Sequence, residues 1–388
     1  MSPRSLFDGL ISAICRLMGV GFRSLLRPRR AVLAPDARIA FLKPCCLGDV
    51  IMATAAVAAV RGGYPQAHLT FITGEWSREV LRHSLHLDET LTWDWSTAGR
   101  LSDLRRLIGL LRRGRYDAVL VLDRSPLLGV AAWLAGVPLR AGMDSGGRGF
   151  SLTHPAAAVA GRHEALLYLD VAAQLEVDIN SPRLEVAIAP PDEAWAQARL
   201  PAGDWVAVHT GGGVNPGSTL TAKRWPVVRF AELAARLQGT GHQIVVVGGE
   251  GDAGLAGDTA DAAPQGVALD LRGQTTLGQL AAVLARCRLF VGNDTGPMHL
   301  AVAVGTPVVA VFGPSKPAWY RPFSDRSRVV YHGAACAGCS FRGGLVQRCV
   351  NQYRCMDLAT VDEVWDGCTE LLGREAEQTE GQTGRVPR

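Results

Sequence analysis

The feature that most constrains the fold is a repeated alternation between short apolar runs and longer segments with helical spacing. In the first half of the chain, apolar runs at 39–42, 68–73 and 118–122 are each followed by such a segment. The pattern begins again at 205–209 and continues to 308–312. Short buried runs that alternate with helices are typical of parallel sheets covered by helices on both faces. The sequence therefore predicts an α/β protein with two doubly wound domains.

The length of the chain also favours two cores. It has 388 residues, of which 48% are hydrophobic, and a single core stops growing near about 250–300 residues. We expect an N-terminal domain at 33–188, a boundary rich in proline and acidic residues, and a C-terminal domain at 204–372. Residues 373–388 are rich in Gly, Glu, Gln and Arg and are predicted to be a disordered tail. A ligand is expected at the carboxyl ends of the strands, in a cleft between the two domains.

Residues 1–32 form a basic extension that leaves two interpretations open. Apolar residues recur there at helical spacing, from Leu6 to Leu25. The extension is either an amphipathic helix on an anionic membrane surface or an extra helix packed on the body with solvated arginines. Its first 30 residues contain one aspartate and six arginines, at positions 4, 16, 23, 27, 29 and 30.

Charge and cysteine content exclude other classes. The net charge is +4, so the body outside the arginine-rich extension is close to neutral, which argues against a nucleic-acid partner. No apolar run approaches the roughly 20 residues that span a bilayer, and no clear signal peptide is present. Nine cysteines, an odd number, favour a reducing, cytoplasmic location.

The strongest chemical signal is the sequence Asp-Thr-Gly-Pro-Met-His from Asp294 to His299, between an apolar strand and an apolar helix. Asp294 or Thr295 can cap this helix, and a proline suits its first turn. Backbone N–H groups at the helix start would then face the edge of the sheet and bind a diphosphate. His299 can add a further donor. Capping alone would not explain Gly296 and His299 together in that turn.

Two further motifs fall in the second domain. Lys223 begins Lys-Arg-Trp-Pro after a Gly-Gly-Gly run, and its ammonium can neutralise a phosphate. Glu250 lies in Gly-Gly-Glu-Gly-Asp after an apolar strand, where a carboxylate can accept ribose hydroxyls. The alternatives are a solvated basic loop in which Trp225 covers the core, and a glycine-rich turn with an incidental acid.

In the first domain, Gly48 and Asp49 follow the first strand and open the next helix. A carboxylate at that place can take the proton from an acceptor hydroxyl. The alternative is that Asp49 only caps the helix.

Together these motifs resemble glycosyltransferase family 9, which contains the ADP-heptose:lipopolysaccharide heptosyltransferases. The resemblance covers about residues 38–366 and is carried by Lys-x4-Gly-Asp, Lys-x-Trp-Pro, Gly-Gly-x-Gly-Asp and Asp-Thr-Gly-x-x-His-Leu-Ala. It implies a GT-B fold, in which two Rossmann-like domains face a cleft. It further implies an inverting transfer of heptose from ADP-heptose to a lipid-linked lipopolysaccharide inner-core acceptor, with no cofactor required, at the cytosolic face of the inner membrane.

The resemblance also implies roles for individual residues. Asp49 matches the catalytic base, with Lys43 and Gly48 in the turn before it. Asp294 matches a residue near the donor sugar and Glu250 the acid on the nucleoside side. The diphosphate contacts match Lys223, Thr295, Gly296 and His299.

The sequence departs from simpler members of the family in two places, the N-terminal extension and the long loop at 211–222. A second basic segment, with arginines at 105, 106, 112 and 113, can attract an anionic lipid acceptor.

Two other functions are compatible with the same motifs. They are a sugar-nucleotide epimerase or hydrolase of the same fold, and a non-catalytic module that binds an ADP-sugar.

A cysteine-rich segment at 336–355 stands apart from these motifs. Its four cysteines can hold a structural zinc ion, or they are reduced thiols that pack a loop. Their spacing is looser than in common zinc ribbons. They are Cys336, Cys339, Cys349 and Cys355.

Overall fold

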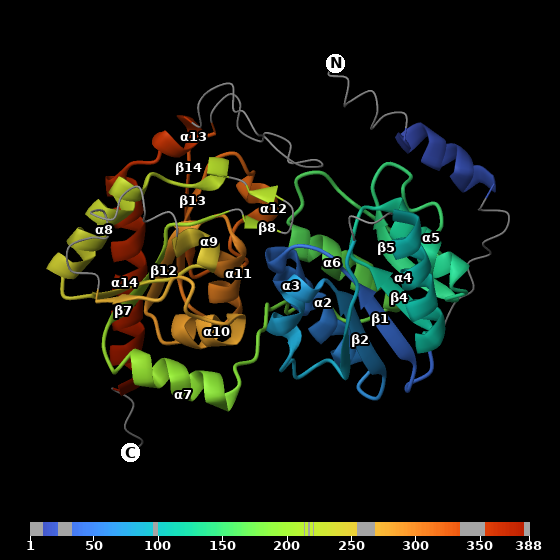
Figure 1. Ribbon diagram of the computed structural model, residues 1–388, viewed down its shortest axis with the longest axis horizontal. Coiled ribbons are helices and arrows are strands. Elements are labelled where there is room, and N and C mark those ends of the chain that lie inside the picture. Colours follow the sequence, from blue (N-terminus) through green and yellow to red (C-terminus); the bar gives the residue numbers. More distant parts are fainter. Residues whose placement is uncertain are drawn as a thin grey trace. The chain divides into compact units, whose positions relative to one another are not determined.

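The computed structural model divides the chain into two compact units, Met1–Glu185 and Val186–Arg388 (Figure 1). It describes residues 11–21, 33–95, 100–212, 214–215, 218–219, 221–253, 268–333 and 354–383. Each unit has its own sheet and core, so the prediction of two doubly wound α/β domains is confirmed.

The first unit contains a six-stranded parallel sheet with the order β3-β2-β1-β4-β5-β6. Its central strands are short and mostly apolar, as is typical of strands covered on both faces. In the register of β1 and β2, Phe41 lies opposite Phe71, and their rings stack with centroids 5.9 Å apart. The strands are β1 (Arg38–Leu42), β2 (His68–Thr73), β3 (Glu89–Thr92), β4 (Ala118–Val121), β5 (Leu139–Asp144) and β6 (His154–Ala157).

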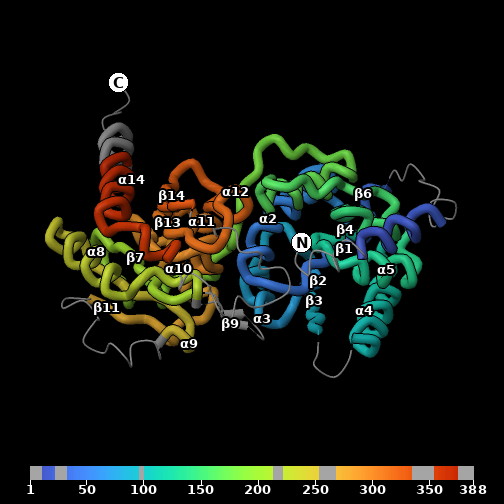
Figure 2. Tube along the Cα trace, turned by 90° about the horizontal axis from the view of Figure 1, so that it is seen from above, coloured from blue at the N-terminus to red at the C-terminus, as the bar shows by residue number. Residues whose placement is uncertain are grey.

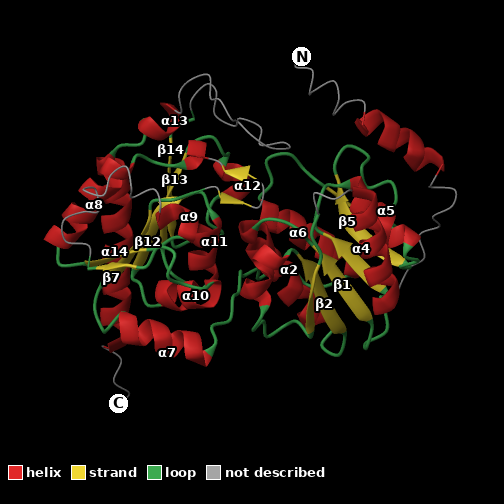
Figure 3. Ribbon diagram, viewed as in Figure 1, coloured by secondary structure: helices red, strands yellow, loops and turns green. Residues whose placement is uncertain are grey.

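Helices cover both faces of this sheet (Figure 3). On one face α4 (Arg100–Gly114) and α5 (Pro126–Leu134) pack against each other, and both contribute to one apolar cluster with the strands. The helices α2 (Leu47–Gly63) and α6 (Glu164–Ala172) also pack against each other. Short helical turns α3 (Glu75–Arg78), η1 (Glu79–Leu81) and η2 (Ala173–Leu175) complete the unit.

The second unit repeats the plan. Its six-stranded parallel sheet has the order β11-β10-β7-β12-β13-β14, which is again third, second, first, fourth, fifth and sixth along the chain when the separate β8–β9 hairpin is left out. The strands are β7 (Trp205–His209), β10 (Gln243–Val246), β11 (Leu269–Asp270), β12 (Leu289–Asn293), β13 (Val308–Phe312) and β14 (Ser327–Tyr331), and the hairpin is β8 (Val214–Asn215) and β9 (Ser218–Thr219).

The helices α8 and α14 lie side by side (Figure 2), and both share a core cluster with the strands of the second sheet. The helix α10 packs against both α11 and α7. The helices are α7 (Pro190–Arg199), α8 (Val227–Gly239), α9 (Glu250–Ala253), α10 (Leu277–Ala285), α11 (Gly296–Ala303), α12 (Pro317–Tyr320), α13 (Arg354–Asp357) and α14 (Val361–Thr383), with a 3-10 turn η3 (Thr221–Lys223).

Two segments outside the predicted domains contain helices. The boundary expected at 189–204 contains α7, whose start has proline at its first positions, where no N–H partner is needed. The tail expected to be disordered after 373 is helical as far as Thr383. An ion pair between Arg374 and Glu370, four residues apart, stabilises the helix across that point.

The extension contains a helix at 11–21. One side of this helix packs on the first unit. There Gly146 and Gly147 of the unit lie close to Ser12 and Arg16 of the helix. Cys15 is buried on the same helix. Among the described residues, no helix has the length and hydropathy needed to cross a bilayer.

Both sheets have a point at which the strand order reverses direction, between β1 and β4 and between β7 and β12. In open α/β sheets the loops that leave such neighbouring strands run to opposite faces, and ligands bind beyond the carboxyl ends of these strands. Lys43 follows β1 and Asp294 follows β12, so these two predicted site residues lie next to the reversal points.

Candidate active site

In the first unit, Lys43 follows β1 and Asp123 follows β4, the two strands that border the reversal point. The Nζ atom of Lys43 lies 3.2 Å from a carboxylate oxygen of Asp123 and 3.2 Å from one of Asp49. Lys43 is only 5% exposed, whereas both carboxylates are partly exposed. The lysine therefore holds two carboxylates at one edge of the sheet.

Asp49 lies in the first turn of α2 and does not cap it. The cap position belongs to Cys46, whose side chain makes no capping bond. The interpretation of Asp49 as a simple helix cap is therefore wrong. Its carboxylate instead pairs with Lys43, and a negative charge in the first helical turn is favourable.

Burial and the shared lysine push the two carboxyl groups in opposite directions. Burial raises the pKa of Asp49, against the opposing charge of Lys43. For Asp123, burial alone would raise the pKa, but Lys43 and a hydrogen bond from the Ser125 N–H hold it below its usual range. Although burial alone would lower the pKa of Lys43, the surrounding acidic groups keep it well above its usual value. Asp49 is thus the more basic carboxylate of the pair.

The helix α6 supplies the rest of this polar cluster. Its buried Glu164 forms a two-point ion pair with Arg124, with both nitrogen–oxygen distances 2.7 Å. The ring of Tyr168 lies 5.9 Å from the Nζ atom of Lys43, in cation–π geometry. Both side chains face the same charged centre from the helix packed on α2.

In the second unit, β12 leads through Asp294 into α11. Thr295 occupies the cap position, with proline in the first turn, as the sequence predicts. The Thr295 side chain makes no capping bond to the helix. The backbone N–H groups of this first turn therefore keep their capacity to bind an anion at the positive end of the helix.

The Thr295 hydroxyl is engaged in a chain of polar contacts instead. Its Oγ1 lies 3.3 Å from Nδ1 of His209, and Nε2 of His209 lies 3.3 Å from a carboxylate oxygen of Asp252. Burial alone would raise the pKa of Asp252, but the hydrogen bonds from His209 and from the Gly249 N–H hold it below its usual range. These polar contacts connect the ends of β7 and β12 to α9.

Lys223 lies beside the same turn. Its Nζ atom is 2.7 Å from a carboxylate oxygen of Asp294 and 3.4 Å from the Asp294 carbonyl oxygen. Trp225, two residues on, is fully buried and donates its ring N–H to the Ala359 carbonyl, so it belongs to the core. The motif thus combines a core anchor with a lysine held at the site.

Asn293 fixes the loops around this centre. Its amide nitrogen donates to the Gly211 carbonyl at 2.7 Å, and its amide oxygen accepts from the Trp225 N–H at 3.0 Å. Gly211 is required by close approach, because a Cβ there would lie 2.0 Å from a carboxylate oxygen of Asp252.

Two predicted residues are placed differently from the rest. Glu250 is exposed at the start of α9, whereas Asp252 two residues later is buried among the polar contacts. His299 is buried, with 3% of its surface exposed. The roles expected for Glu250 and His299 stay predictions.

The structure adds His209, Asp252, Asn293 and Asp123 to the predicted set. His209 and Asn293 end β7 and β12, Asp123 follows β4, and Asp252 lies in the short helix after β10. Polar residues at the ends of apolar strands are the signal that could have found the first three.

Only part of the cysteine-rich segment can be assessed. Cys336, Cys339 and Cys349 lie outside the described residues, and Cys355 is buried at α13. Within the described part of the chain, no three or more His, Cys, Asp or Glu side chains group as a metal site would require.

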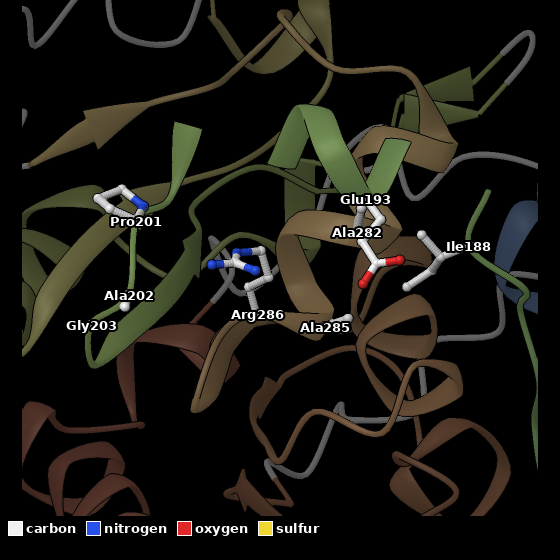
Figure 4. Close-up of a pocket in the computed structure, with 8 residues that line it drawn as sticks. All are labelled: Ile188, Glu193, Pro201, Ala202, Gly203, Ala282, Ala285 and Arg286. Atoms are coloured by element: carbon white, nitrogen blue, oxygen red, sulfur yellow. The ribbon is translucent and has the colours of Figure 1, made fainter. Parts of the chain in front are cut away.

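A cavity of about 400 Å³ in the second unit lies away from these residues (Figure 4). Pro201 and Gly203 line it just before β7, and Arg286 lines it just before β12. It is therefore at the amino ends of the strands, opposite the edge that carries the polar residues. The Arg286 guanidinium is bound to the Leu200 carbonyl.

Comparisons with known proteins agree with this arrangement. A family model described as Glycosyltransferase family 9 (heptosyltransferase) matches residues 104–346. Lipopolysaccharide heptosyltransferase 2 of Salmonella typhimurium is 27% identical over 315 residues, covering 76% of this chain and 87% of that protein. The Escherichia coli K12 protein of the same name is 28% identical, with the same coverage of each chain.

Solved structures show the same fold. A family 9 glycosyltransferase from Veillonella parvula has a TM-score of 0.73 and 25% identity, covering 89% of this chain and 100% of that one. The ADP-heptose lps heptosyltransferase II of E. coli has a TM-score of 0.70 and 23% identity, covering 87% of this chain and 99% of that one. The predicted GT-B class is thereby confirmed.

Proposed function

The chain belongs to glycosyltransferase family 9, and from that premise we propose that it transfers a heptose from ADP-heptose to a lipopolysaccharide inner-core acceptor, inverting the anomeric centre. The proposal draws the sugar and the acceptor class from the heptosyltransferase relatives. The observation that carries it is the start of α11, where Thr295 occupies the cap position without capping the helix. A positive helix end without a side-chain cap, beside Lys223, suits a nucleotide diphosphate.

The second unit is proposed to bind the donor. As the bond between the sugar and the diphosphate breaks, negative charge grows on the leaving ADP while positive charge grows on the sugar ring. Fixed donors at Lys223, Thr295 and the Gly296 end of α11 stabilise that leaving group electrostatically. His299 is assigned to the same diphosphate, and Glu250 to the nucleoside side.

Asp294 has a double task in this proposal. Its carboxylate holds the Lys223 ammonium at 2.7 Å, which orients the lysine before the donor arrives. It also leaves negative charge near the donor sugar, where positive charge develops during transfer. Orientation and charge balance therefore come from one ion pair.

The first unit is proposed to activate the acceptor. The acceptor hydroxyl oxygen attacks the anomeric carbon, and Asp49 takes its proton. A carboxylate whose pKa is raised by burial is a better base than an ordinary one. Lys43 and Gly48 shape the turn that presents it, and Asp123 shares the lysine from the neighbouring strand.

Because the proposed acceptor is linked to a lipid, we also propose that the protein binds a membrane surface. The helix at 11–21 leaves Ile14, Leu17, Met18 and Val20 exposed. Arginines before and after it in the sequence and those of α4 would meet the anionic groups of the lipid-linked acceptor. This assigns the N-terminal extension a peripheral contact at the cytosolic face of the inner membrane.

The proposal is tested by Asp49→Asn, which removes the base and preserves shape. We expect kcat for heptose transfer to fall by about 10²–10⁴-fold, as for loss of a general base, while the affinity for ADP measured by calorimetry changes little. Asp36→Asn makes the same chemical change at an exposed residue of the first unit and should leave kcat unaltered. Normal turnover by Asp49→Asn would refute the assignment of the base.

A parallel incubation with ADP-heptose alone separates the rival activities. Release of free sugar or of an isomer without an acceptor would indicate a hydrolase or an epimerase. Binding of ADP without any reaction would indicate a binding module.

A further inference from the structure

Two adjacent cysteines lie in the loop between β1 and α2, in the interval from Lys43 to Asp49. The Sγ atoms of Cys45 and Cys46 are 2.6 Å apart. Cys45 is exposed and Cys46 is partly exposed. The proposed function uses neither thiol.

The backbone holds the two side chains together. Cys46 has a φ of 74° at the cap position of α2, a region that residues other than glycine rarely adopt. Side chains of successive residues in extended backbone point to opposite sides, and this turn brings them to one side instead. A sparsely populated conformation next to reactive groups is a common mark of a functional loop.

We propose that Cys45 and Cys46 are an oxidation site, at which a low-molecular-weight disulfide such as oxidised glutathione converts the two thiols into a reversible disulfide that stops heptose transfer. The effect on transfer rests on the proposed function, whereas the oxidation itself does not.

The chemistry proceeds by two exchanges. The Cys45 thiolate attacks one sulfur of oxidised glutathione, forms a mixed disulfide and releases one glutathione thiolate, which takes up a proton. The Cys46 thiolate, formed when its proton passes to water, then attacks the Cys45 sulfur and releases the second glutathione. Two thiols are oxidised and one glutathione disulfide is reduced to two glutathiones.

Cys45 is suited to the first attack. The hydrogen bond from Cys46, assisted by the charge of Lys43, lowers the pKa of Cys45 against the effect of burial. The same hydrogen bond and burial raise the pKa of Cys46. The exposed thiol therefore reacts first, and the second thiol closes the ring.

The disulfide is expected to be easily reduced. Consecutive Cα atoms are about 3.8 Å apart, which is shorter than the roughly 4.4–6.8 Å usual for disulfides. Bonds strained in this way have more oxidising potentials and belong to labile, regulatory sites.

Ring closure would act on the base through the helix start. The Cys46 carbonyl accepts the Val50 N–H at 3.0 Å, the bond that begins α2. Rotation of the Cys45–Cys46 unit into a ring disturbs this bond and with it the turn that carries Asp49. A shift of about 1 Å at a catalytic group can reduce the rate by about 100-fold.

The test treats the purified full chain with oxidised glutathione and follows both mass and activity. Trypsin releases residues 39–61 as one peptide, because Lys43 precedes a proline, and this peptide contains no other cysteine. We expect the peptide to lose two hydrogen atoms and transfer to fall by about tenfold or more, with dithiothreitol restoring both.

Two variants fix the assignment, each compared with its own reduced form. Cys45→Ser should keep its transfer rate after oxidation, even though the cysteines at 336–355 are still present. Cys46→Ser should retain glutathione on Cys45, because no second thiol can displace it.

The remaining outcomes are decisive. A wild-type peptide that keeps glutathione attached, an oxidised protein that transfers at the full rate, or equal loss of activity in Cys45→Ser would each overturn the proposal. If the reduced protein transfers no heptose, the proposed function fails, and the peptide mass still decides whether the disulfide forms.

Discussion

Lys43 shows how much of the proposed chemistry depends on a single side chain. Its ammonium lies at hydrogen-bonding distance from both Asp49 and Asp123, so its positive charge acts on both carboxylates. The pKa of Asp49 rises by burial and in part through the negative charge of Asp123. The pKa of the proposed base therefore depends mainly on burial and Lys43, and to a smaller extent on Asp123, which follows the neighbouring strand.

This arrangement predicts the effect of Asp123→Asn on the pH profile. Asp49 must be ionised to accept a proton, so transfer is lost as the pH falls through its pKa. Removing the negative charge of Asp123 lowers that pKa, and the acid limb of the kcat profile should move to lower pH. Kinetics across the acid range measure the shift, with Asp36→Asn as the control. A limb that moves to higher pH would contradict the coupling.

At the scale of elements, the helix at 11–21 has two unlike sides. One packs on the first unit through small residues, and the other leaves Leu17 74% and Val20 72% exposed. Four exposed apolar side chains on one short helix, Ile14, Leu17, Met18 and Val20, are typical of a surface that binds a membrane or another protein. The two interpretations of the extension, a packed helix and a membrane-facing helix, are compatible because they use different sides.

We therefore expect Leu17→Asp to weaken binding to anionic vesicles by about tenfold or more, since burying one leucine contributes about 1.5–3 kcal/mol. Cosedimentation with vesicles rich in phosphatidylglycerol measures the bound fraction. Leu85→Asp is the matched control, because Leu85 is 84% exposed in the same unit but lies outside this helix. Equal losses in both variants would show that the helix has no special part.

Elements with a clear period or a short apolar run could be predicted from the sequence. The strands at 68–73, 205–209 and 308–312 have the predicted bounds. The strand β6 could not be predicted, because it is a short edge strand that contains a proline. The helix α6 could not either, because it is buried nearly all round and lacks a polar face.

Site residues could be predicted from the sequence where they lie together in one short motif. The Asp294–His299 turn and the Gly48–Asp49 turn each lie in one stretch of sequence. The contacts of His209 with Thr295 and Asp252 depend on which strands are neighbours, and that order is not written in any local pattern. Neighbouring acids such as Glu250 and Asp252 also cannot be told apart before the turn is folded.

At the scale of the whole molecule, each unit has its own sheet and its own core. If ADP binds the second unit alone, mass action stabilises that unit, by about 2.7 kcal/mol at a concentration 100 times the dissociation constant. Hydrogen exchange resolved by peptide should show protection in β7 and β12, with little change in β1 and β4. UDP, GDP and CMP serve as comparison nucleotides. Equal protection by CMP would argue against an adenine donor.

The reversal of strand order in both sheets has an evolutionary consequence. Every residue assigned to the reaction sits on a loop or a first helical turn beyond the strands, while the buried strands below share one plan in both halves. Selection can therefore exchange the sugar, the nucleotide or the receiving glycan by editing connecting segments, with the two scaffolds inherited unchanged and each half free to diversify at its own pace.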